Sequence, residues 1–509
     1  MGDVVRNIIC LLRASAPPRE IIFAAVASLL TASNSVIAAE SPLADAAENR
    51  NVAKIRQLLD ERVQVDQAQV DGMTALHWAV HHEDASLAEQ LVQAGANVNA
   101  MNRYGVTPLS LACTGGNLSL VESLLRASAD PNAALKGGET PLMTAARTGK
   151  LGPVQALLAR GAKVDAKEKK GQTALMWAAA DGHADVVAAL IEAGADFRAS
   201  LPSGFTPLLF AVRDGRAEVV QVLLKAGANP NDATEPAKRP MGRAPDAGTN
   251  PLILAVENGH FDLAVTLLEA GADPNDQRSG LSPLHALTWI RKPNRGDGID
   301  GDPAPRGSGT LTSLEFVRKL VHYGADVNLR LKKGPSGKGM LTRTGATPFL
   351  LAAYTADVPF MKTLLELGAD PDIANADGCT PLLATVGVGT RFPGEEAGTP
   401  PEVLDSLELL LSLGADINAV DKNGETAMHG AAYKSLPKAV QYLADKGADI
   451  ELWNKRNKHG WTPLLIAEGY RPGNFKPSVE TIAALHRVML AAGVTPPAKP
   501  MPPEPGKTY

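Results

Sequence analysis

The chain of 509 residues is poor in cysteine, in aromatic residues and in surplus charge. Its three cysteines exclude a disulfide framework and any cysteine-rich zinc or iron–sulfur module. Fifty basic and 55 acidic residues give a formal charge of −5, which disfavours general attraction to nucleic acid. Hydrophobic residues make up 45% and aromatics only 4%, so the chain has the composition of a folded protein with a largely aliphatic core.

Sequence motifs for catalysis are also lacking. The chain has no His-Glu-x-x-His, no Gly-x-Ser-x-Gly and no Cys-x-x-Cys. Asp297, Asp300 and Asp302 lack the spacing of a calcium loop. The segment 334–339 lacks the first Gly and the final Ser or Thr of a phosphate-binding loop. We therefore expect no enzyme activity and no cofactor.

The N-terminus has the layout of a secretory signal. Arg6, Arg13 and Arg19 precede the apolar run 21–30, and small residues lead to Ala38 and Ala39. This pattern predicts a signal peptide at residues 1–39 and a product that is periplasmic or secreted. An uncleaved anchor is the alternative, but polar residues interrupt the run before it reaches ~20 apolar residues. No later segment is apolar enough to span a membrane, so we expect no span in the mature chain.

The most informative feature is an internal repeat of 33 residues. Glycines recur at this interval before a Thr-Pro-Leu-like tetrad, at Gly72, Gly105, Gly138, Gly171 and Gly204. A second series keeps the same interval and mostly reads Gly-Ala-Asp/Asn, at Gly95, Ser128, Gly161, Gly194 and Gly227. Beyond residue 227 the intervals lengthen irregularly. Two series with one period predict a chain built from repeated units.

Each unit has the pattern of two short helices. In the fifth unit Thr173 is placed to cap the first helix, and Gly182 to end it in a left-handed conformation. Val186, Val187 and Leu190 have the spacing of one buried stripe on the second helix. An extended finger then connects each pair to the next.

Helix, turn, helix and finger with these signatures resemble the ankyrin repeat family. The closest segments are 72–79, 105–109 and 271–275. The resemblance implies an all-α solenoid of about twelve helix-turn-helix units with short β-hairpin fingers, over residues 40–497. We place insertions at 234–247, 291–311, 332–344, 387–401 and 470–478. Those in helix–helix connections are expected to project from one edge, and the Pro-rich tail 498–509 is expected to be disordered.

Histidine offers one alternative reading. His77 and His81 are four residues apart and would share a helix face, as metal ligands can. His77 follows the Leu of the tetrad, however, where we expect a structural role, and no third ligand is evident. We predict no metal site. Of the two cysteines outside the signal, Cys113 is expected in the core and Cys379 at a more exposed position.

The family resemblance implies a concave binding face made of finger tips and first helices. Its slots are the two residues before each registered Gly, the one after it, and the ninth and tenth after it. Aromatics exceed their 4% share in these slots, mostly in the last five units. Our predicted partner-binding residues are Tyr104, Phe205, Trp289, Tyr354, Tyr433, Trp461, Tyr470, Arg103, Lys434 and Lys458.

Together these features predict an exported, monomeric, non-catalytic scaffold that binds another protein and no nucleic acid. Two alternatives stay open. One is a structural envelope spacer without a specific binding site. The other is an enzyme or a ligand or metal carrier built on the inserted loops.

Overall fold

The computed structural model describes residues 41–235, 247–293, 305–336, 340–394, 396–471 and 476–497. The expected signal at 1–39, the tail 498–509 and the acidic loop at 297–302 lie outside these residues. The described chain divides into two compact bodies. We call residues 41–229 the N-terminal body, and residues 230–234 with the described residues from 247 onward the C-terminal body.

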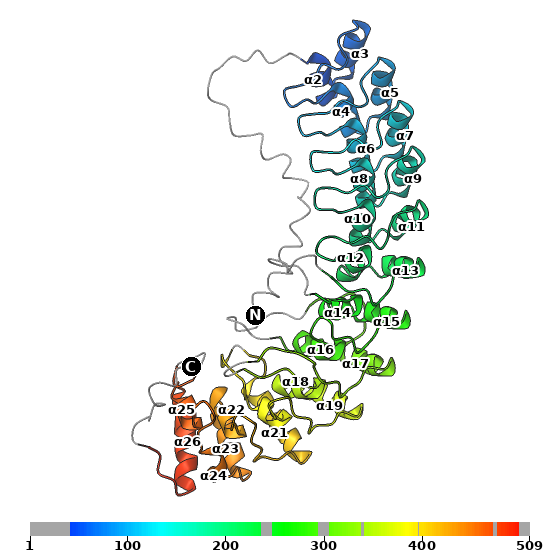
Figure 1. Cartoon of the computed structure of the whole chain (residues 1–509). Coiled ribbons are helices and arrows are strands. Elements are labelled where there is room, and N and C mark those ends of the chain that lie inside the picture. Colours follow the sequence, from blue (N-terminus) through cyan, green and yellow to red (C-terminus); the bar gives the residue numbers. More distant parts are fainter. Residues whose placement is uncertain are drawn as a thin grey trace, which may run out of the picture. The chain divides into compact units, whose positions relative to one another are not determined.

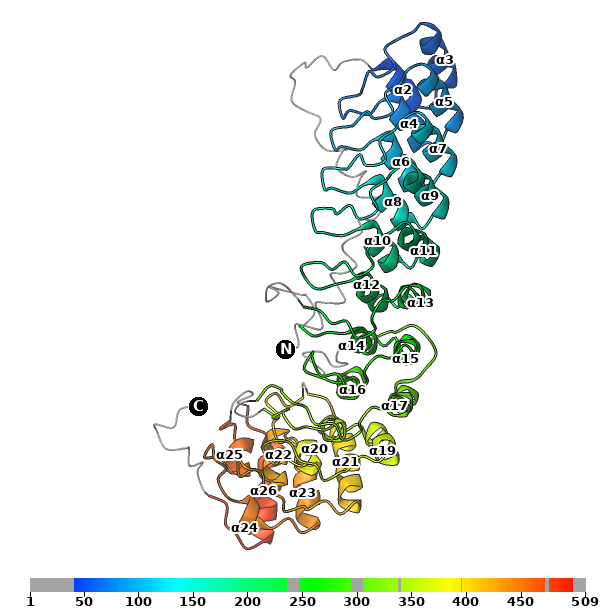
Figure 2. The same cartoon turned by 45° about the vertical axis from the view of Figure 1, so that its right-hand side comes forward.

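The N-terminal body consists of six helix pairs (Figure 1). First helices pack on first helices of neighbouring units, and from the second unit on, second helices pack on second helices. Figure 2 shows these two layers, with the fingers leaving the layer of first helices. The pairs are α2 (Pro42–Glu48) with α3 (Val52–Asp60), α4 (Ala75–His81) with α5 (Ala85–Gln93), α6 (Pro108–Gly115) with α7 (Leu118–Arg126), α8 (Pro141–Thr148) with α9 (Leu151–Ala159), α10 (Ala174–Asp181) with α11 (Ala184–Glu192), and α12 (Pro207–Arg213) with α13 (Ala217–Lys225).

The C-terminal body repeats the same layering with six further pairs. They are α14 (Pro251–Glu257) with α15 (Phe261–Glu269), α16 (Pro283–Arg291) with α17 (Ser313–His322), α18 (Pro348–Tyr354) with α19 (Val358–Glu366), α20 (Pro381–Thr385) with α21 (Pro400–Ser412), α22 (Ala427–Tyr433) with α23 (Pro437–Asp445), and α25 (Pro463–Ala467) with α26 (Val479–Ala491). The short α24 (Ile450–Trp453) lies in the finger before the last pair. The described chain thus confirms the predicted all-α stack of about twelve units, and none of its helices has the length and apolar character needed to cross a bilayer.

The helix ends form as the local sequence predicts. Thr173 caps α10, because its hydroxyl accepts a hydrogen bond from the backbone N–H of Met176 at 3.3 Å. Gly182 ends the same helix with a φ of 91°, a left-handed conformation that glycine adopts without steric cost. Val186 and Val187 of α11 are buried. Threonine also caps α4, α6, α8 and α12, and α6 and α8 also end at a left-handed glycine, so in the N-terminal body these helix ends are specified by local sequence.

The fingers are tight hairpins rather than strands. In the fourth unit the N–H of Leu135 donates to the carbonyl of Glu139 at 2.9 Å, and the N–H of Gly138 donates to the carbonyl of Leu135 at 2.8 Å. These two bonds close the hairpin and are too few for a ladder between strands. Adjacent fingers also bond to each other, since the N–H of Arg103 donates to the carbonyl of Asp71 at 2.9 Å.

Glycine at the tip lets neighbouring fingers approach closely. Gly72 has a φ of 88°, and a Cβ there would lie 2.8 Å from the Cα of Asn102 in the next finger. Gly138 likewise has a φ of 94°, with a Cβ position 3.1 Å from the Cα of Glu168. A side chain at either place would force the fingers apart. In the N-terminal body the tips therefore form one continuous row in register, which we call the finger row: residues 70–72, 102–105, 135–138, 168–171 and 201–204.

Candidate protein-binding surface

Exposed apolar side chains gather at the first two tips of the finger row. Val70 is 81% exposed, Met101 at the base of the next tip 55% and Tyr104 56%. Their fingers are neighbours, joined by the hydrogen bond from Arg103 to Asp71. A patch of exposed large apolar side chains on neighbouring loops is typical of an interaction surface. We call Val70, Met101 and Tyr104 the apolar end of the finger row.

Cations occupy the same register position in the following fingers. Arg103, Lys136 and Lys169 each lie two residues before the tip glycine, and all three are exposed. The guanidinium of Arg103 lies 5.0 Å from the centroid of the Tyr104 ring and donates to its hydroxyl at 2.9 Å. Within the described part of the chain, Lys136 and Lys169 make no ion pair. The row is therefore positively charged beside its apolar end.

The finger row also contains two acidic residues, Asp71 and Glu168, against the four cations Arg103, Lys136, Lys169 and Lys170, so its formal net charge is +2. The carboxylate of Glu168 is buried, where it accepts hydrogen bonds from the backbone N–H of Lys170 at 2.8 Å and of Gln172 at 3.0 Å. It thus shapes the tip of its own finger. Glu139 is half-buried beside Gly137.

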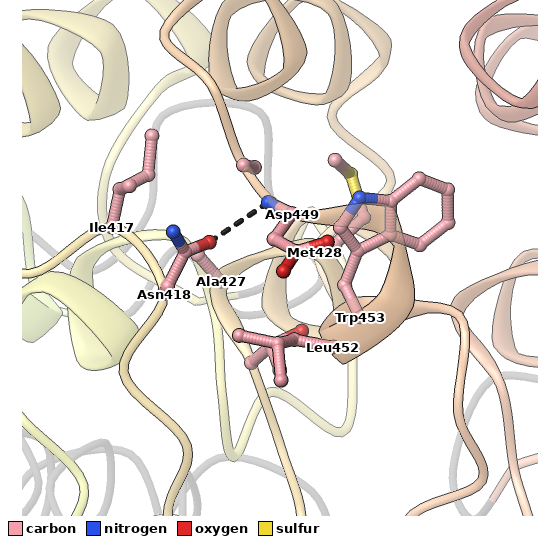
Figure 3. Close-up of a pocket in the computed structure, with 9 residues that line it drawn as sticks. Ile417, Asn418, Ala427, Met428, Asp449, Leu452 and Trp453 are labelled. Carbon is pink, nitrogen blue, oxygen red and sulfur yellow. Dashed lines mark hydrogen bonds between the residues drawn. The ribbon is translucent and has the colours of Figure 1, made fainter. Parts of the chain in front are cut away.

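Two small hollows lie in the described part of the chain, one in each body. A groove of about 140 Å³ lies between the second and third units, lined by residues that include His81, Glu83 and Thr114. Figure 3 shows the other, of about 10 Å³, in which the N–H of Asp449 donates to the Asn418 side chain at 2.8 Å. The 10 Å³ hollow holds one water at most. The volume of the 140 Å³ groove is well below the ~300 Å³ that is typical of the smallest small-molecule sites. Neither favours an enzyme or ligand carrier.

In the C-terminal body residues of the inserted segments contact aromatics at the ends of three first helices. Arg343, from the lengthened finger 332–344, stacks on Trp289 at the end of α16, with its guanidinium carbon 4.1 Å from the ring centroid. Glu396, from the insertion 387–401, accepts a hydrogen bond at 2.5 Å from the hydroxyl of Tyr354 at the end of α18. Burial and then the Glu396 charge raise the pKa of Tyr354 well above 10. Both aromatics are half-buried by this contact with their own chain.

The third contact of this kind involves Tyr433 at the end of α22. Arg471, from the insertion 470–478, donates to the Tyr433 carbonyl, and burial lowers the pKa of this guanidinium to about 10. The Tyr433 hydroxyl donates to Glu425 at 2.9 Å, and Asn457 donates to the same carboxylate oxygen at 2.9 Å. Burial, followed by the charge of Asp421, raises the pKa of Glu425 to about 7.

The insertion 387–401 does not project as we expected. A Cβ on Gly387 would lie 2.8 Å from the carbonyl oxygen of Gly430, and one on Gly389 would lie 2.2 Å from the backbone N of Leu341. The ammonium group of Lys434 donates to the carbonyl of Ala397 at 2.9 Å. The segment is therefore folded back on its neighbours and held by polar contacts.

The predicted binding residues divide by exposure. Arg103, Tyr104 and Lys458 are exposed, and Trp289, Tyr354 and Tyr470 are half-buried. Phe205, Tyr433, Trp461 and Lys434 are buried, which corrects their expected surface placement. Phe205 packs against Phe210 with ring centroids 5.1 Å apart. Whether the exposed residues contact a partner stays a prediction.

The residue after each tip glycine explains part of this error. At seven of these positions the residue is buried: Met73, Phe205, Thr249, Ala346, Cys379, Glu425 and Trp461. They point beneath the finger, and the signal for this was their mostly apolar character. Cys379 is one of them, so our expectation of an exposed thiol was wrong; burial raises the pKa of this thiol well above 9.

The repeat histidines have structural roles. The Nδ1 of His77 accepts from the Thr74 N–H at 3.2 Å, and its Nε2 lies 3.0 Å from the carbonyl of Val106 in the next finger. Both ring nitrogens are engaged, which leaves none for a metal. Among the described residues no group of three or more His, Cys, Asp or Glu side chains is arranged to hold a metal ion. His285 and His429 repeat this bridge, and burial lowers the pKa of each to about 4.

Comparison with known proteins identifies the repeat. A family model described as "Ankyrin repeats (3 copies)" matches residues 22–102, 43–134, 80–168, 109–200, 142–234, 198–278 and 402–480. A second model, "Ankyrin repeat", matches residues 344–376. These matches cover more than half of the chain. The chain belongs to the ankyrin repeat family. Ankyrin repeats generally mediate protein–protein interaction, and the family is typically non-catalytic.

The relatives share the repeat rather than a whole protein. The human neurogenic locus notch homolog protein 1 is 33% identical over 156 residues, 26% of this chain and 6% of that protein. The human SH3 and multiple ankyrin repeat domains protein 2 is 30% identical over 186 residues, 32% of this chain and 9% of that protein. The chain thus spans less than a tenth of these curated relatives. The solved human ASB11 ankyrin repeat domain aligns with 46% of this chain and all of its own, at 27% identity and a TM-score of 0.39.

Proposed function

We propose that this protein is a non-catalytic scaffold that holds a protein partner on the finger row of its N-terminal body. The observation that carries this proposal is the exposed apolar end formed by Val70, Met101 and Tyr104. Apolar and aromatic side chains anchor interfaces because they bury a large area at small entropic cost. Arg103 and Lys136 lie beside this apolar end and provide a charged rim. In the C-terminal body, by contrast, the aromatics Trp289, Tyr354 and Tyr433 at the ends of first helices contact residues of its own insertions.

A capture experiment tests the binding surface. The full chain, immobilised through its C-terminus, is incubated with periplasmic or culture extract, and captured proteins are quantified by mass spectrometry. The triple variant Val70→Ser, Met101→Ser, Tyr104→Ala should reduce recovery of the principal partner by about tenfold or more, as expected on losing a hot spot. The matched control Leu413→Ser, Val420→Ser, Leu490→Ser removes exposed apolar side chains of the C-terminal body and should leave recovery unchanged.

Equal recovery by both variants would refute a binding site on the finger row and would favour the alternative of a structural spacer. Thermal unfolding should remain close to that of the parent protein for both variants, because all six side chains are exposed.

We further propose that the protein is exported and acts as a monomer in the periplasm or outside the cell. Support comes from the basic, apolar and small-residue pattern of residues 1–39. Intact-mass measurement of the protein recovered from native cells should give a chain that begins at Ala39 or Glu40. Recovery of an unprocessed chain in the cytoplasm would contradict export and leave the binding proposal standing.

A further inference from the structure

The finger row has a regular electrostatic pattern that points to the chemistry of its partner. Arg103, Lys136 and Lys169 stand one per finger at the same register position, 33 residues apart. Neighbouring fingers lie close together, since a Cβ added to Gly105 would lie 3.4 Å from the backbone N of Lys136. The N–H of Lys169 donates to the Gly137 carbonyl at 2.9 Å, which joins the third and fourth fingers of the row. The three cations thus belong to one continuous edge.

The same register position carries four cations in the described C-terminal body; Lys458 is exposed, and the other three are engaged within the chain. Arg278 forms an ion pair with Asp276 at 2.6 Å. Arg343 stacks on Trp289, and the Lys422 ammonium donates to the carbonyl of Ala376 at 2.7 Å. Lys136 and Lys169 have no such partner within the described part of the chain. A row of exposed cations with a net positive charge favours an anionic occupant.

The distance between successive fingers matches the side-chain spacing of an extended peptide segment. Neighbouring helices pack at ~8–10 Å, so successive fingers repeat at about that distance. A polyproline II segment advances ~3.1 Å per residue with three residues per turn, so every third side chain lies on one face at ~9 Å intervals. Acidic residues at positions i, i+3 and i+6 would therefore meet one cation each.

We propose that the finger row binds an extended acidic segment of a partner protein, with carboxylates at every third residue and an apolar side chain at the end that meets Val70, Met101 and Tyr104. This inference rests on the proposed function and adds the partner's chemistry. Each exposed pair contributes little alone, and several aligned pairs together fix the register of the segment. The apolar contact fixes which end of the segment lies at the second finger.

Designed peptides test the spacing. The probe has three Glu-Pro-Pro triplets followed by Leu-Pro-Pro, and a second probe has the Leu triplet first, because the direction of the segment is not prescribed. The comparison peptide has the same composition with its three Glu residues adjacent. Fluorescence anisotropy with the full chain should show that one spaced probe binds at least ~5-fold more tightly than the comparison peptide, because only evenly spaced carboxylates can form all three ion pairs together.

Charge reversal tests the residues. The variant Arg103→Glu, Lys136→Glu, Lys169→Glu should weaken binding of the spaced probe by ~10-fold or more, because three attractions become repulsions. The control Arg56→Glu, Arg126→Glu, Lys225→Glu makes the same change in net charge at exposed positions of the second helices. It should leave the affinity within about twofold, since charges beyond ~10 Å are screened at 0.1 M salt.

Three results would overturn the inference: equal binding of spaced and comparison peptides, no binding of any probe, or equal weakening by both charge-reversal variants. Tighter binding of a twelve-nucleotide oligo-dT with the same dependence on Arg103, Lys136 and Lys169 would also overturn it, in favour of a nucleic acid. In each case a partner whose capture still depends on Tyr104 would leave the proposed function intact.

Discussion

The two bodies are built from the same repeat and differ in what lies on their first helices. In the N-terminal body the cations and apolar side chains at the finger tips are exposed. In the C-terminal body residues from three insertions, Arg343, Glu396 and Arg471, each contact an aromatic residue of the preceding unit. One fold thus carries exposed tip residues in one body and aromatics in contact with its own insertions in the other. The aromatic residues of the C-terminal body are therefore better explained as anchors for its own loops.

The largest effect is expected from truncating the inward aromatics. Tyr433 and Trp461 are each 1% exposed, so replacing either by Ala should destabilise the C-terminal body by about 3–5 kcal/mol. Tyr104→Ala, at an exposed tip, should change the free energy of unfolding by less than about 0.5 kcal/mol. Urea unfolding followed by circular dichroism measures both. If Tyr433→Ala lowered the free energy of unfolding only slightly and Tyr104→Ala lowered it strongly, the assignment of Tyr433 to the core and of Tyr104 to the surface would be wrong.

A pH effect of intermediate size is expected from Glu425 in the C-terminal body. Its folded pKa of about 7 lies above its ordinary value of 4.5, so the folded state keeps a proton that the unfolded state releases. Its contribution to stability is fully present below pH 4.5 and is lost as the pH rises through 7. His285 and His429, with folded pKa values of about 4, act in the opposite direction below pH 6.5.

The variant Glu425→Gln separates these contributions. Hydrogen exchange of peptides from residues 421–471, measured between pH 5 and 8 and corrected for intrinsic rates, should show protection that falls with rising pH in the parent protein relative to the variant. The N-terminal body should show the same pH profile in both proteins. Parallel profiles for residues 421–471 in parent and variant would mean that Glu425 does not titrate in this range.

The smallest expected effect concerns one irregular residue of the N-terminal body. Ser128 takes the place of the glycine found at positions 95 and 161 and has a φ of 70°. A left-handed conformation costs a residue with a Cβ ~1 kcal/mol, so Ser128→Gly should stabilise the N-terminal body by ~0.5–1 kcal/mol, offset in part by the entropy of glycine in the unfolded chain. The reverse change, Gly161→Ser, should destabilise it by a similar amount in the same unfolding assay.

The repeat was predictable because its determinants are local. Thr173 and Gly182 lie within the helix that they begin and end, so a single sequence indicates both caps. The contacts between insertions and aromatics in the C-terminal body were not predictable, because Glu396 meets Tyr354 across 42 residues and no periodic pattern links them. Cys379 was misplaced for a different reason, because the position after the tip glycine is buried in seven fingers and we expected it to be exposed. Its finger is bonded to the preceding lengthened finger, where Asn375 donates to the carbonyl of Thr342 at 2.7 Å.

The even spacing of the finger row has a consequence for recognition. A row with identical steps looks almost the same after a shift of one unit, so a segment with regularly spaced carboxylates would lose only one contact by sliding along it. Val70, Met101 and Tyr104 occur at one end only and remove this ambiguity. They therefore fix the register in which the acidic segment binds, which the cations alone do not determine.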